Sequence, residues 1–251
     1  MNQPIEQTEP RRSRRAGGRS ARQALRSAPL AEDIRPVRAG MTGGTYRPLT
    51  DADVLRIHHA ALDACEQIGF ADAPQSGIDV LTGAGAILGD DGRIRIPRAM
   101  VEDMLAVAAR DITICGQNPK HDLHLSGSKV HFGTAGAAVH VVDVENRTYR
   151  ESTLQDLYDA ARIVEQLDNV HFFQRPMVAR DLTDNYLLDI NTLYGCVKGT
   201  SKHIGTSFVG PENMPGCLEF LYTIAGGEAK FRERPFVSNS TVFVVPPMTF
   251  A

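Results

Sequence analysis

The sequence has few cysteines and no pair of them close together. Cys65, Cys115, Cys196 and Cys217 are far apart and form no CxxC motif, which argues against a zinc ribbon and against a disulfide scaffold. Unpaired thiols fit a reducing compartment, so we expect a cytoplasmic protein. The chain also lacks any run approaching the roughly 18–20 consecutive apolar residues of a membrane span. We therefore expect no membrane partner.

Motifs for covalent catalysis and for nucleotide binding are missing as well. Gly133–Ala137 follows a strand-like run but has neither the ending of a P-loop nor the spacing of a dinucleotide fingerprint. There is no GxSxG elbow, and no cysteine stands beside a base. The SGSK turn at 126–129 predicts a hairpin with His124 opposite His131, but no carboxylate completes a metal site. We expect no metal, and the catalytic residues stay unknown.

Positive charge is concentrated at the start of the chain. The net charge is −3, yet residues 1–40 hold nine arginines and four acidic residues, a balance of +5 that leaves −8 for the remainder. Few apolar residues accompany these arginines, so we predict a disordered basic arm over residues 1–40. A solvated tail is the preferred interpretation over contact with an acidic partner. No nucleic-acid partner is expected, because charge alone specifies no base contact.

Residues 41–126 have the pattern of a small α/β region that precedes a repeat. Thr50 followed by Asp53 predicts the capped start of a helix, and Gly89–Gly92 between two apolar runs predicts a hairpin. Pro97 opens another helix-patterned segment, and a strand is expected at Ile112–Cys115.

Four strand-like runs alternate with helix-patterned segments in residues 127–251. They begin at Val130, Val170, His203 and Phe236, in steps of 40, 33 and 33 residues. Repeated strand–helix units predict a parallel sheet or a (βα)8 TIM-type barrel, which needs roughly 250 residues. Residues 127–251 would form about the first half of such a barrel, so we expect a piece of a longer protein. A complete small doubly wound domain is the alternative.

The ends of these strands combine aromatic rings with neutral polar groups. In a barrel, the carboxyl ends of the strands carry the chemistry. Rings and neutral hydrogen-bonding groups suit a small quaternary ammonium, although any one ring could instead fill the barrel interior. Arg175 and Lys202 could bind a substrate carboxylate or pair with Asp181 or Asp184. The candidate substrate-binding residues are Phe132, Thr134, Phe172, Gln174, Thr206 and Asn239.

Several collinear segments resemble the N-terminal half of the trimethylamine methyltransferase family. They are RPVRAGMTGGTYRPLTDADVLRIHHAALDACEQIGF, RIRIPRAMVEDML, VHFGTAGAAVHVVD, YRESTLQDLYDAARIVEQLDNVHFF and TSKHIGTSF. The resemblance implies a (βα)8 barrel and an enzyme that demethylates a small methylated amine such as trimethylamine or glycine betaine. It implies that no cofactor is bound directly, because the methyl group passes to the Co(I) corrinoid of a separate carrier protein. It assigns no catalytic residue here, and a homo-oligomer is left open.

Two hypotheses other than a methyltransferase are left open. The chain could be a non-catalytic binding module, in which part of a barrel holds a quaternary amine or a partner. It could also be a fragment that is inactive and only marginally folded alone.

Overall fold

The computed structural model describes most of the chain, and its internal contacts divide the chain at Pro36. The described residues are 19–28, 35, 38–240, 244–245 and 248–250. Unit Met1–Pro36 contains helix α1 (Arg19–Ser27), and the larger unit is Val37–Ala251. Helix α1 lies within the segment for which the sequence predicts a disordered arm, and residues 1–18 lie outside the described residues. The domain boundaries at 40 and 126 stay predictions.

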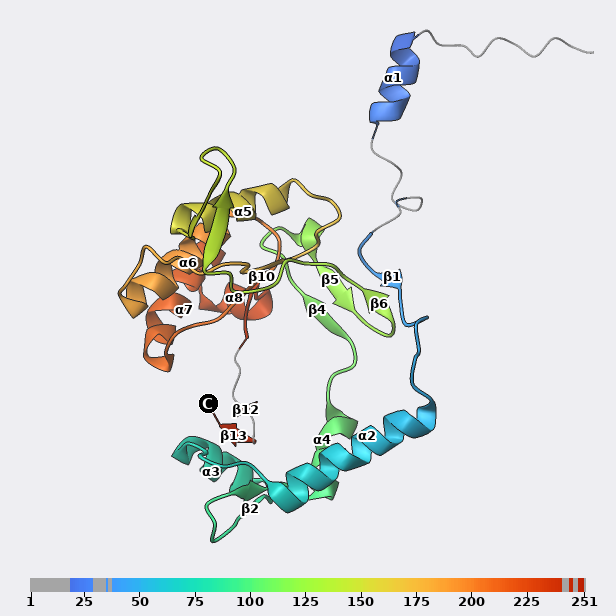
Figure 1. Ribbon diagram of the computed structural model, residues 1–251, viewed down its shortest axis with the longest axis vertical. Coiled ribbons are helices and arrows are strands. Elements are labelled where there is room, and N and C mark those ends of the chain that lie inside the picture. The colour runs from blue at the N-terminus through green and yellow to red at the C-terminus, as the bar shows by residue number, and fades with distance from the viewer. Residues whose placement is uncertain (1–18, 29–34, 36–37, 241–243, 246–247, 251) are drawn as a thin grey trace, which may run out of the picture. The chain divides into compact units, whose positions relative to one another are not determined.

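The first part of the larger unit consists of short helices and two-stranded antiparallel ladders (Figure 1). Its elements are β1 (Met41–Thr42), α2 (Asp51–Asp63), the π-helix η2 (Ala64–Ile68), α3 (Gln75–Gly83), β2 (Ile87–Leu88), β3 (Ile94–Arg95), α4 (Arg98–Val107), β4 (Ile112–Ile114), the 3-10 helix η3 (Pro119–His121), β5 (Leu123–Leu125) and β6 (Lys129–Val130). The capping box predicted at Thr50 and Asp53 is confirmed. The hairpin predicted around Gly89–Gly92 is confirmed as the antiparallel pair β2–β3.

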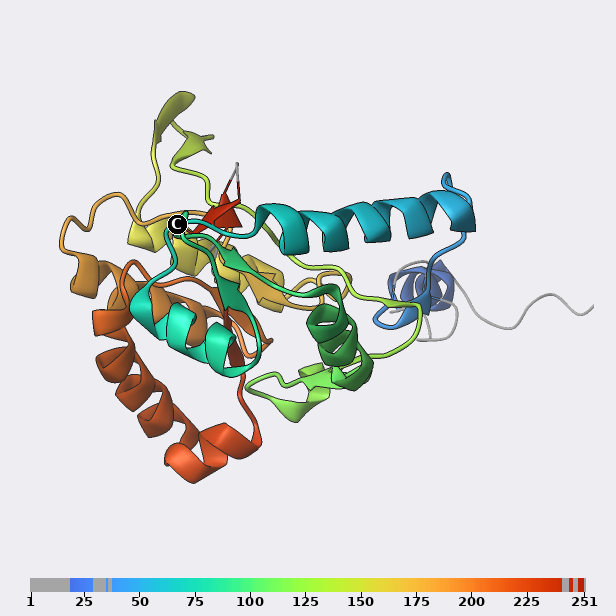
Figure 2. The ribbon, with the colours of Figure 1, turned by 90° about the horizontal axis from the view of Figure 1, so that it is seen from below.

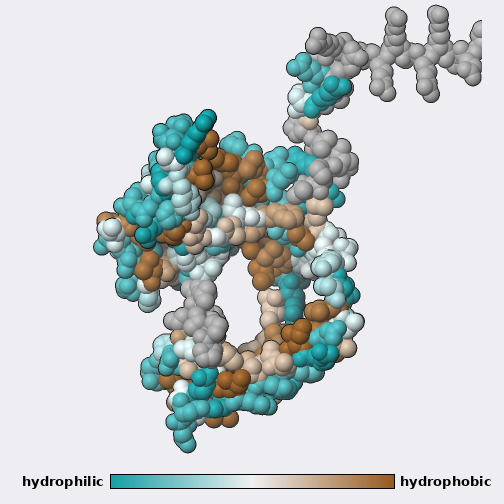
Figure 3. All heavy atoms as spheres, viewed as in Figure 1, coloured by the Kyte–Doolittle hydropathy of each residue, from teal (hydrophilic) through white to brown (hydrophobic). Residues whose placement is uncertain are grey.

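Helices α2 and α4 keep much of their apolar surface exposed. Leu62 is the buried residue of α2, and α4 has no buried residue. Figure 3 colours hydrophobic residues brown and shows them over this region. The exposed apolar side chains of the two helices are Val54, Leu55, Ile57, Met104, Leu105 and Val107. Tertiary packing therefore stabilises α2 only weakly, and its capping box matters correspondingly more.

The pairing of β5 and β6 differs from the prediction. The SGSK turn predicted His124 opposite His131, but β5 pairs with β4, which places His124 opposite Thr113. Strand β6 pairs with β1 instead, with Val130 opposite Met41. The predicted hairpin was wrong because each strand finds a partner that is more distant in the chain. His131 Nε2 lies 3.2 Å from the backbone oxygen of His124, so the two imidazoles do not form a cross-strand pair.

The second part of the larger unit alternates strands with helices. Its elements are β7 (His140–Asp143), β8 (Thr148–Glu151), α5 (Leu154–Glu165), β9 (Phe173–Gln174), α6 (Asn185–Gly199), β10 (Ile204–Thr206), the 3-10 helix η4 (Pro211–Asn213), α7 (Met214–Ala225), α8 (Glu228–Glu233), β11 (Val237–Asn239), β12 (Val244–Val245) and β13 (Thr249–Phe250). Helix α8 follows α7 after Gly226, which has a left-handed conformation with φ of 81°. Figure 2 shows these two orange-red helices meeting at an angle.

Strands β9, β10 and β11 form one parallel sheet in the order β11-β10-β9. Gly133 adds a single parallel bridge to Phe172 beside β9. The four predicted runs thus lie side by side in chain order, although the first contributes only a bridge. The described residues confirm a mixed α/β architecture, and they form no closed barrel.

Helices α5, α6 and α7 pack on one face of this sheet. Their buried residues form one core cluster with Phe173 of β9 and Ile204 of β10, both fully buried. The residues that α5, α6 and α7 contribute to this cluster are Leu157, Ala161, Val164, Leu193, Cys196, Val197, Cys217 and Leu221. Burying these side chains is the main favourable contribution to folding of this region. The opposite face of the sheet is free of these helices.

Helix α6 buries part of the apolar stripe that helical spacing predicts, which is Leu187, Ile190, Tyr194 and Val197. Val197 is buried and Ile190 packs against the core, whereas Leu187 and Tyr194 are 49% and 47% exposed. The buried stripe includes polar residues, above all Asp189, which is 2% exposed. Its carboxylate accepts hydrogen bonds from the Val209 backbone N–H and from Asn213 Nδ2. An apolar count missed part of this face because buried polar groups with partners occupy that part.

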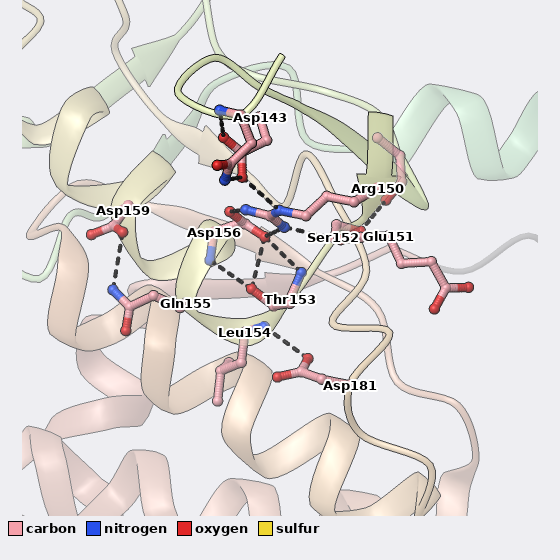
Figure 4. A network of polar contacts seen from close by, with 12 residues as sticks. Asp143, Arg150, Glu151, Ser152, Thr153, Leu154, Gln155, Asp156, Asp159 and Asp181 are labelled. Carbon is pink, nitrogen blue, oxygen red and sulfur yellow. Dashed lines mark hydrogen bonds and ion pairs between the residues drawn. The ribbon is translucent and has the colours of Figure 1, made fainter. Parts of the chain in front are cut away.

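A hairpin of β7 and β8 is inserted before α5, and a polar network joins it to that helix (Figure 4). The apolar run Val139–Val142 predicts a strand that interrupts the first repeat unit, and β7 confirms it. Arg150 of β8 donates two hydrogen bonds, of 2.7 and 2.9 Å, to the carboxylate of Asp156. Asp156 is also the third residue of α5 and closes a capping box with Thr153. One carboxylate therefore caps the helix and anchors the hairpin.

Candidate functional site: a cavity on the uncovered face of the sheet

Strand alternation separates the residues of the parallel sheet onto two faces. Phe173 and Ile204 are paired in register and point into the helical core. Their neighbours Gln174, Gly205 and Ser238, which are also paired in register, must then share the opposite face. A cavity of about 490 Å³ lies on that face. It is lined by Ile114, Leu123, Leu125, Lys129, Val130, His131, Phe172, Gln174, His203, Gly205 and Ser238.

Two glycines leave room for the largest side chains of this face. A Cβ atom on Gly205 would lie 1.8 Å from Gln174 Oε1, and one on Gly133 would lie 2.3 Å from the Phe172 ring. Real Cβ contacts are never so short, so both side chains occupy space that only glycine provides. Because Gly205 and Gly133 have no side chain, Gln174 and Phe172 can pack directly against the backbone of the sheet.

His203 is the buried polar residue of the cavity wall. It is 5% exposed. Its Nδ1 lies 2.8 Å from the backbone oxygen of Cys115, and its Nε2 lies 2.9 Å from Ser238 Oγ. Burial lowers the pKa of His203 below its ordinary value. The residue therefore acts as a neutral imidazole fixed at both ring nitrogens.

A second buried histidine lies beside the bridge between Gly133 and Phe172. His171 is 6% exposed, and its Nδ1 accepts the Phe132 backbone N–H at 2.9 Å. Burial lowers its pKa, and the nearby His131 and Lys202 lower it further. The rings of His131 and His171 meet edge to face with centroids 6.1 Å apart. His171 is thus a neutral group that fixes the backbone leading into the cavity.

The structure brings two of the six predicted site residues into this cavity. Phe172 and Gln174 line it. Thr134 lies next to them, because its hydroxyl donates to the Gln174 backbone oxygen at 2.5 Å. Phe132 is 49% exposed and has its ring 6.0 Å from that of His171.

Thr206 and Asn239 lie elsewhere. They are paired in register and share the face of Ile204, with Thr206 only 1% exposed and Asn239 exposed. Because one residue along a strand changes the face, the polar strand ends chosen from the sequence fall on both sides of the sheet. A role in substrate binding stays a prediction for all six residues.

Sequence reasoning missed His203, Gly205 and Ser238. All three were inside the predicted strand runs, and strict alternation from Gly205 would have placed His203 on the same face. Ser238 joins them only through the register between β10 and β11. That register pairs residues 33 positions apart in the chain, so no local sequence signal gives it.

Lys202 and Arg175, the two basic residues predicted near the site, both donate hydrogen bonds to other groups of the protein. Lys202 is 3% exposed, and its ammonium donates to three backbone oxygens at 2.6–2.7 Å. Arg175 donates to Ser207 Oγ at 2.8 Å. Asp181 and Asp184, the predicted ion-pair partners, form other contacts. Asp181 accepts a hydrogen bond from the Leu154 backbone N–H, and Asp184 caps the N-terminus of α6. Lys202 therefore holds the chain after α5 and does not reach a ligand.

Neither a metal site nor a membrane span is found within the described residues. No three His, Cys, Asp or Glu side chains among them are grouped to hold an ion. No helix in the described part of the chain has the length and apolar character needed to cross a bilayer.

Comparison with known protein families shows which family the chain belongs to. A sequence model described as trimethylamine methyltransferase (MTTB) matches residues 15–251. The chain belongs to this family. Among its relatives, a trimethylamine methyltransferase MttB from Desulfitobacterium hafniense (strain DSM 10664 / DCB-2) is 28% identical over 85% of the chain. A glycine betaine methyltransferase from Desulfitobacterium hafniense (strain Y51) is 24% identical over 76% of it. A trimethylamine methyltransferase MttB from Methanosarcina thermophila is 23% identical over 79% of it.

The relatives within the trimethylamine methyltransferase family are much longer than the matched segment. The matches cover 42%, 39% and 42% of the three relatives, in the same order. The chain therefore spans about two fifths of the length of the curated relatives it matches.

Proposed function

We propose that this chain forms part of a methyltransferase that takes a methyl group from a small methylated amine and passes it to the Co(I) corrinoid of a separate carrier protein. The substrate would be trimethylamine or a quaternary amine such as glycine betaine. Family membership and the activities for which the relatives are named support the reaction class. The observation that carries the proposal for this chain is the cavity lined by Phe172, Gln174, His203 and Ser238.

The chemistry of the cavity wall fits a small organic cation. No Asp or Glu stands among the described residues that line it, whereas Lys129 does line it. At the surface of the sheet, a ligand would meet the Phe172 ring and the neutral polar groups of Gln174 and Ser238. The Phe172 ring would attract the ammonium through its quadrupole, at a strength of about 0.5–2 kcal/mol. Gln174 would orient the polar part of the ligand. Ile114, Leu123 and Leu125 would exclude water on the other side.

The remaining predicted site residues would surround this centre. Thr134 would fix the strand that carries Gln174 through its 2.5 Å hydrogen bond. Phe132 would contribute an exposed ring at the entrance, and Thr206 with Asn239 would line the strand ends on the other face of the sheet. The parallel order of Gly133, β9, β10 and β11 supports the proposal that these are the first strands of a (βα)8 barrel.

The cavity does not fit a corrinoid. A corrin macrocycle with its side groups is far larger than a space of about 490 Å³, and the cavity is already shaped by Gln174 and Phe172. The proposal therefore leaves the corrinoid on the carrier protein and assigns this chain the binding and orientation of the amine. Co(I) requires reducing conditions, so a corrinoid carrier is consistent with the cytoplasmic location predicted from the sequence.

Methyl transfer measured with the complete protein tests the proposal. Trimethylamine and glycine betaine are offered with a purified Co(I) corrinoid carrier, and cobalt methylation is followed by absorbance. We expect Phe172→Ala to lower kcat/KM roughly tenfold, because a cation–π contact of more than about 1 kcal/mol is lost. Tyr149→Ala is the control, since Tyr149 is 72% exposed on the β7–β8 hairpin.

The outcome also separates the rival function. No methyl transfer across a panel of methylated amines would contradict the proposal. Calorimetric binding of an amine without transfer would instead favour the non-catalytic binding module.

A further inference from the structure

Ser238 and His203 form a hydrogen-bonded pair whose direction is fixed by a third group. His203 Nδ1 faces the backbone oxygen of Cys115 at 2.8 Å. A carbonyl oxygen can only accept, so Nδ1 must carry the imidazole proton. His203 is 5% exposed, and a buried imidazole with no carboxylate bonded to it is neutral. Its Nε2 therefore carries a lone pair and no proton.

The orientation of the Ser238 hydroxyl follows from this tautomer. Ser238 Oγ lies 2.9 Å from His203 Nε2. Because Nε2 can only accept, the hydroxyl proton of Ser238 points to His203. A hydroxyl oxygen has two further acceptor sites, and Ser238 lines the cavity. The oxygen can thus offer a ligand only lone pairs. It cannot donate while the pair is intact.

An acceptor of this kind distinguishes two sorts of methylated ammonium. A protonated tertiary amine, such as trimethylammonium, has one N–H group that can donate a hydrogen bond. A quaternary amine has no N–H and offers only weakly polarised C–H groups. A hydrogen bond to a charged donor is about twice as strong as one between neutral groups.

We propose that Ser238 accepts the N–H of a protonated tertiary methylamine in this cavity, with His203 and the Cys115 backbone oxygen as the positioning groups. The inference rests on the proposed function and deepens it by naming a residue that determines specificity. Ser238 is placed for this role by its register with Gly205, which puts it on the cavity face, on the other side of Gly205 from Gln174. The Phe172 ring on the same face attracts both kinds of cation, so it cannot make this distinction.

Equilibrium binding of two probes to the full chain tests the proposal. Trimethylammonium chloride and tetramethylammonium chloride are titrated at neutral pH into the wild type, Ser238→Ala and Ser238→Thr. We expect Ser238→Ala to weaken trimethylammonium binding about tenfold or more, and tetramethylammonium binding less than about threefold. Ser238→Thr keeps the hydroxyl and should retain the wild-type preference. Equal losses for both probes, or no loss in Ser238→Ala, would overturn the inference.

The imidazole tautomer is the second readout, and it does not depend on ligand binding or activity. Nitrogen-15 NMR of ring-labelled histidine should assign the His203 proton to Nδ1 in the wild type and in Ser238→Thr. A proton on Nε2 would refute the positioning role, because Ser238 would then accept from His203. If the wild type binds neither probe although Nδ1 is protonated, the proposed function fails together with this inference. If it binds both probes equally in every variant, only the inference fails.

Discussion

At the scale of single residues, Lys202 shows how a buried charge can be purely structural. Its ammonium donates to the backbone oxygens of Val164, Leu167 and Val170. We expect Lys202→Met, which keeps most of the aliphatic stem, to lower the free energy of unfolding by roughly 3 kcal/mol because three buried oxygens lose their donor. Urea unfolding monitored by circular dichroism measures the change.

The matched control for that change is Lys198→Met. Lys198 is exposed and lies over the rings of Tyr158 and Tyr194 at 5.4 and 5.2 Å. Exposed contacts of this kind are worth about 0.5–1 kcal/mol. Losses of equal size in the two variants would contradict a special role for Lys202.

Residues with local partners were predictable from the sequence, and residues with distant partners were not. Thr50 caps its helix through Asp53, three residues ahead, so the pattern alone predicts the contact. Lys202 binds oxygens more than 30 residues away, and backbone oxygens leave no mark in a sequence. His203 needs Cys115 and Ser238, which lie 88 and 35 residues away. Its role becomes visible only once the sheet register is known.

At the scale of elements, two helices in the described part of the chain begin with capping boxes of the same chemistry in different surroundings. Thr153 caps α5, which packs against α6 and buries Leu157, Ala161 and Val164. Thr50 caps α2, in which Leu62 is the buried residue. We expect Thr153→Ala to lower the global free energy of unfolding by about 1 kcal/mol. Thr50→Ala should instead increase local fraying of α2 with a smaller global effect.

Native-state hydrogen exchange separates the two outcomes. In Thr153→Ala, the slowest amides of β9 and β10 should lose protection, because their exchange requires global unfolding. In Thr50→Ala, the loss should be confined to α2. A uniform loss of protection in Thr50→Ala would contradict the weak packing of that helix.

The elements themselves were largely predictable, and their partners less so. Start signals at Thr50 and Pro97 located α2 and α4, and the Gly89–Gly92 turn located β2 and β3. The face of α6 was predicted only in part: Ile190 and Val197 face the core as expected, but Asp189 is also buried, with its own hydrogen-bond partners. The pairing of β5 with β6 was predicted wrongly because pairing is a competition among all strands. A turn sequence describes only one of the competitors.

At the scale of the whole molecule, buried neutral histidines make stability depend on pH. Burial lowers the pKa of His171 and His203 in the folded state, whereas the unfolded chain titrates near 6.5. Below that value the unfolded state binds more protons, so the free energy of unfolding falls as the pH falls towards the folded pKa values. Each histidine contributes at most about 1.4 kcal/mol per pH unit.

Urea unfolding at pH 7.5 and pH 5.5 measures this loss. His171→Asn is the informative variant, because an amide oxygen can still accept the Phe132 N–H while the titrating group is removed. We expect the difference in stability between the two pH values to shrink in this variant. An unchanged difference would show that His171 does not carry the effect.

The contact between Gln174 and Gly205 has a consequence for engineering. The amide of Gln174 occupies the volume that any side chain at position 205 would need. A side chain at position 205 would therefore require Gln174 to leave the place it holds here. A library that randomises residue 205 alone would displace Gln174 in most of its members. Randomising both positions together, with one residue growing as the other shrinks, would reshape the cavity while keeping a side chain packed on the sheet.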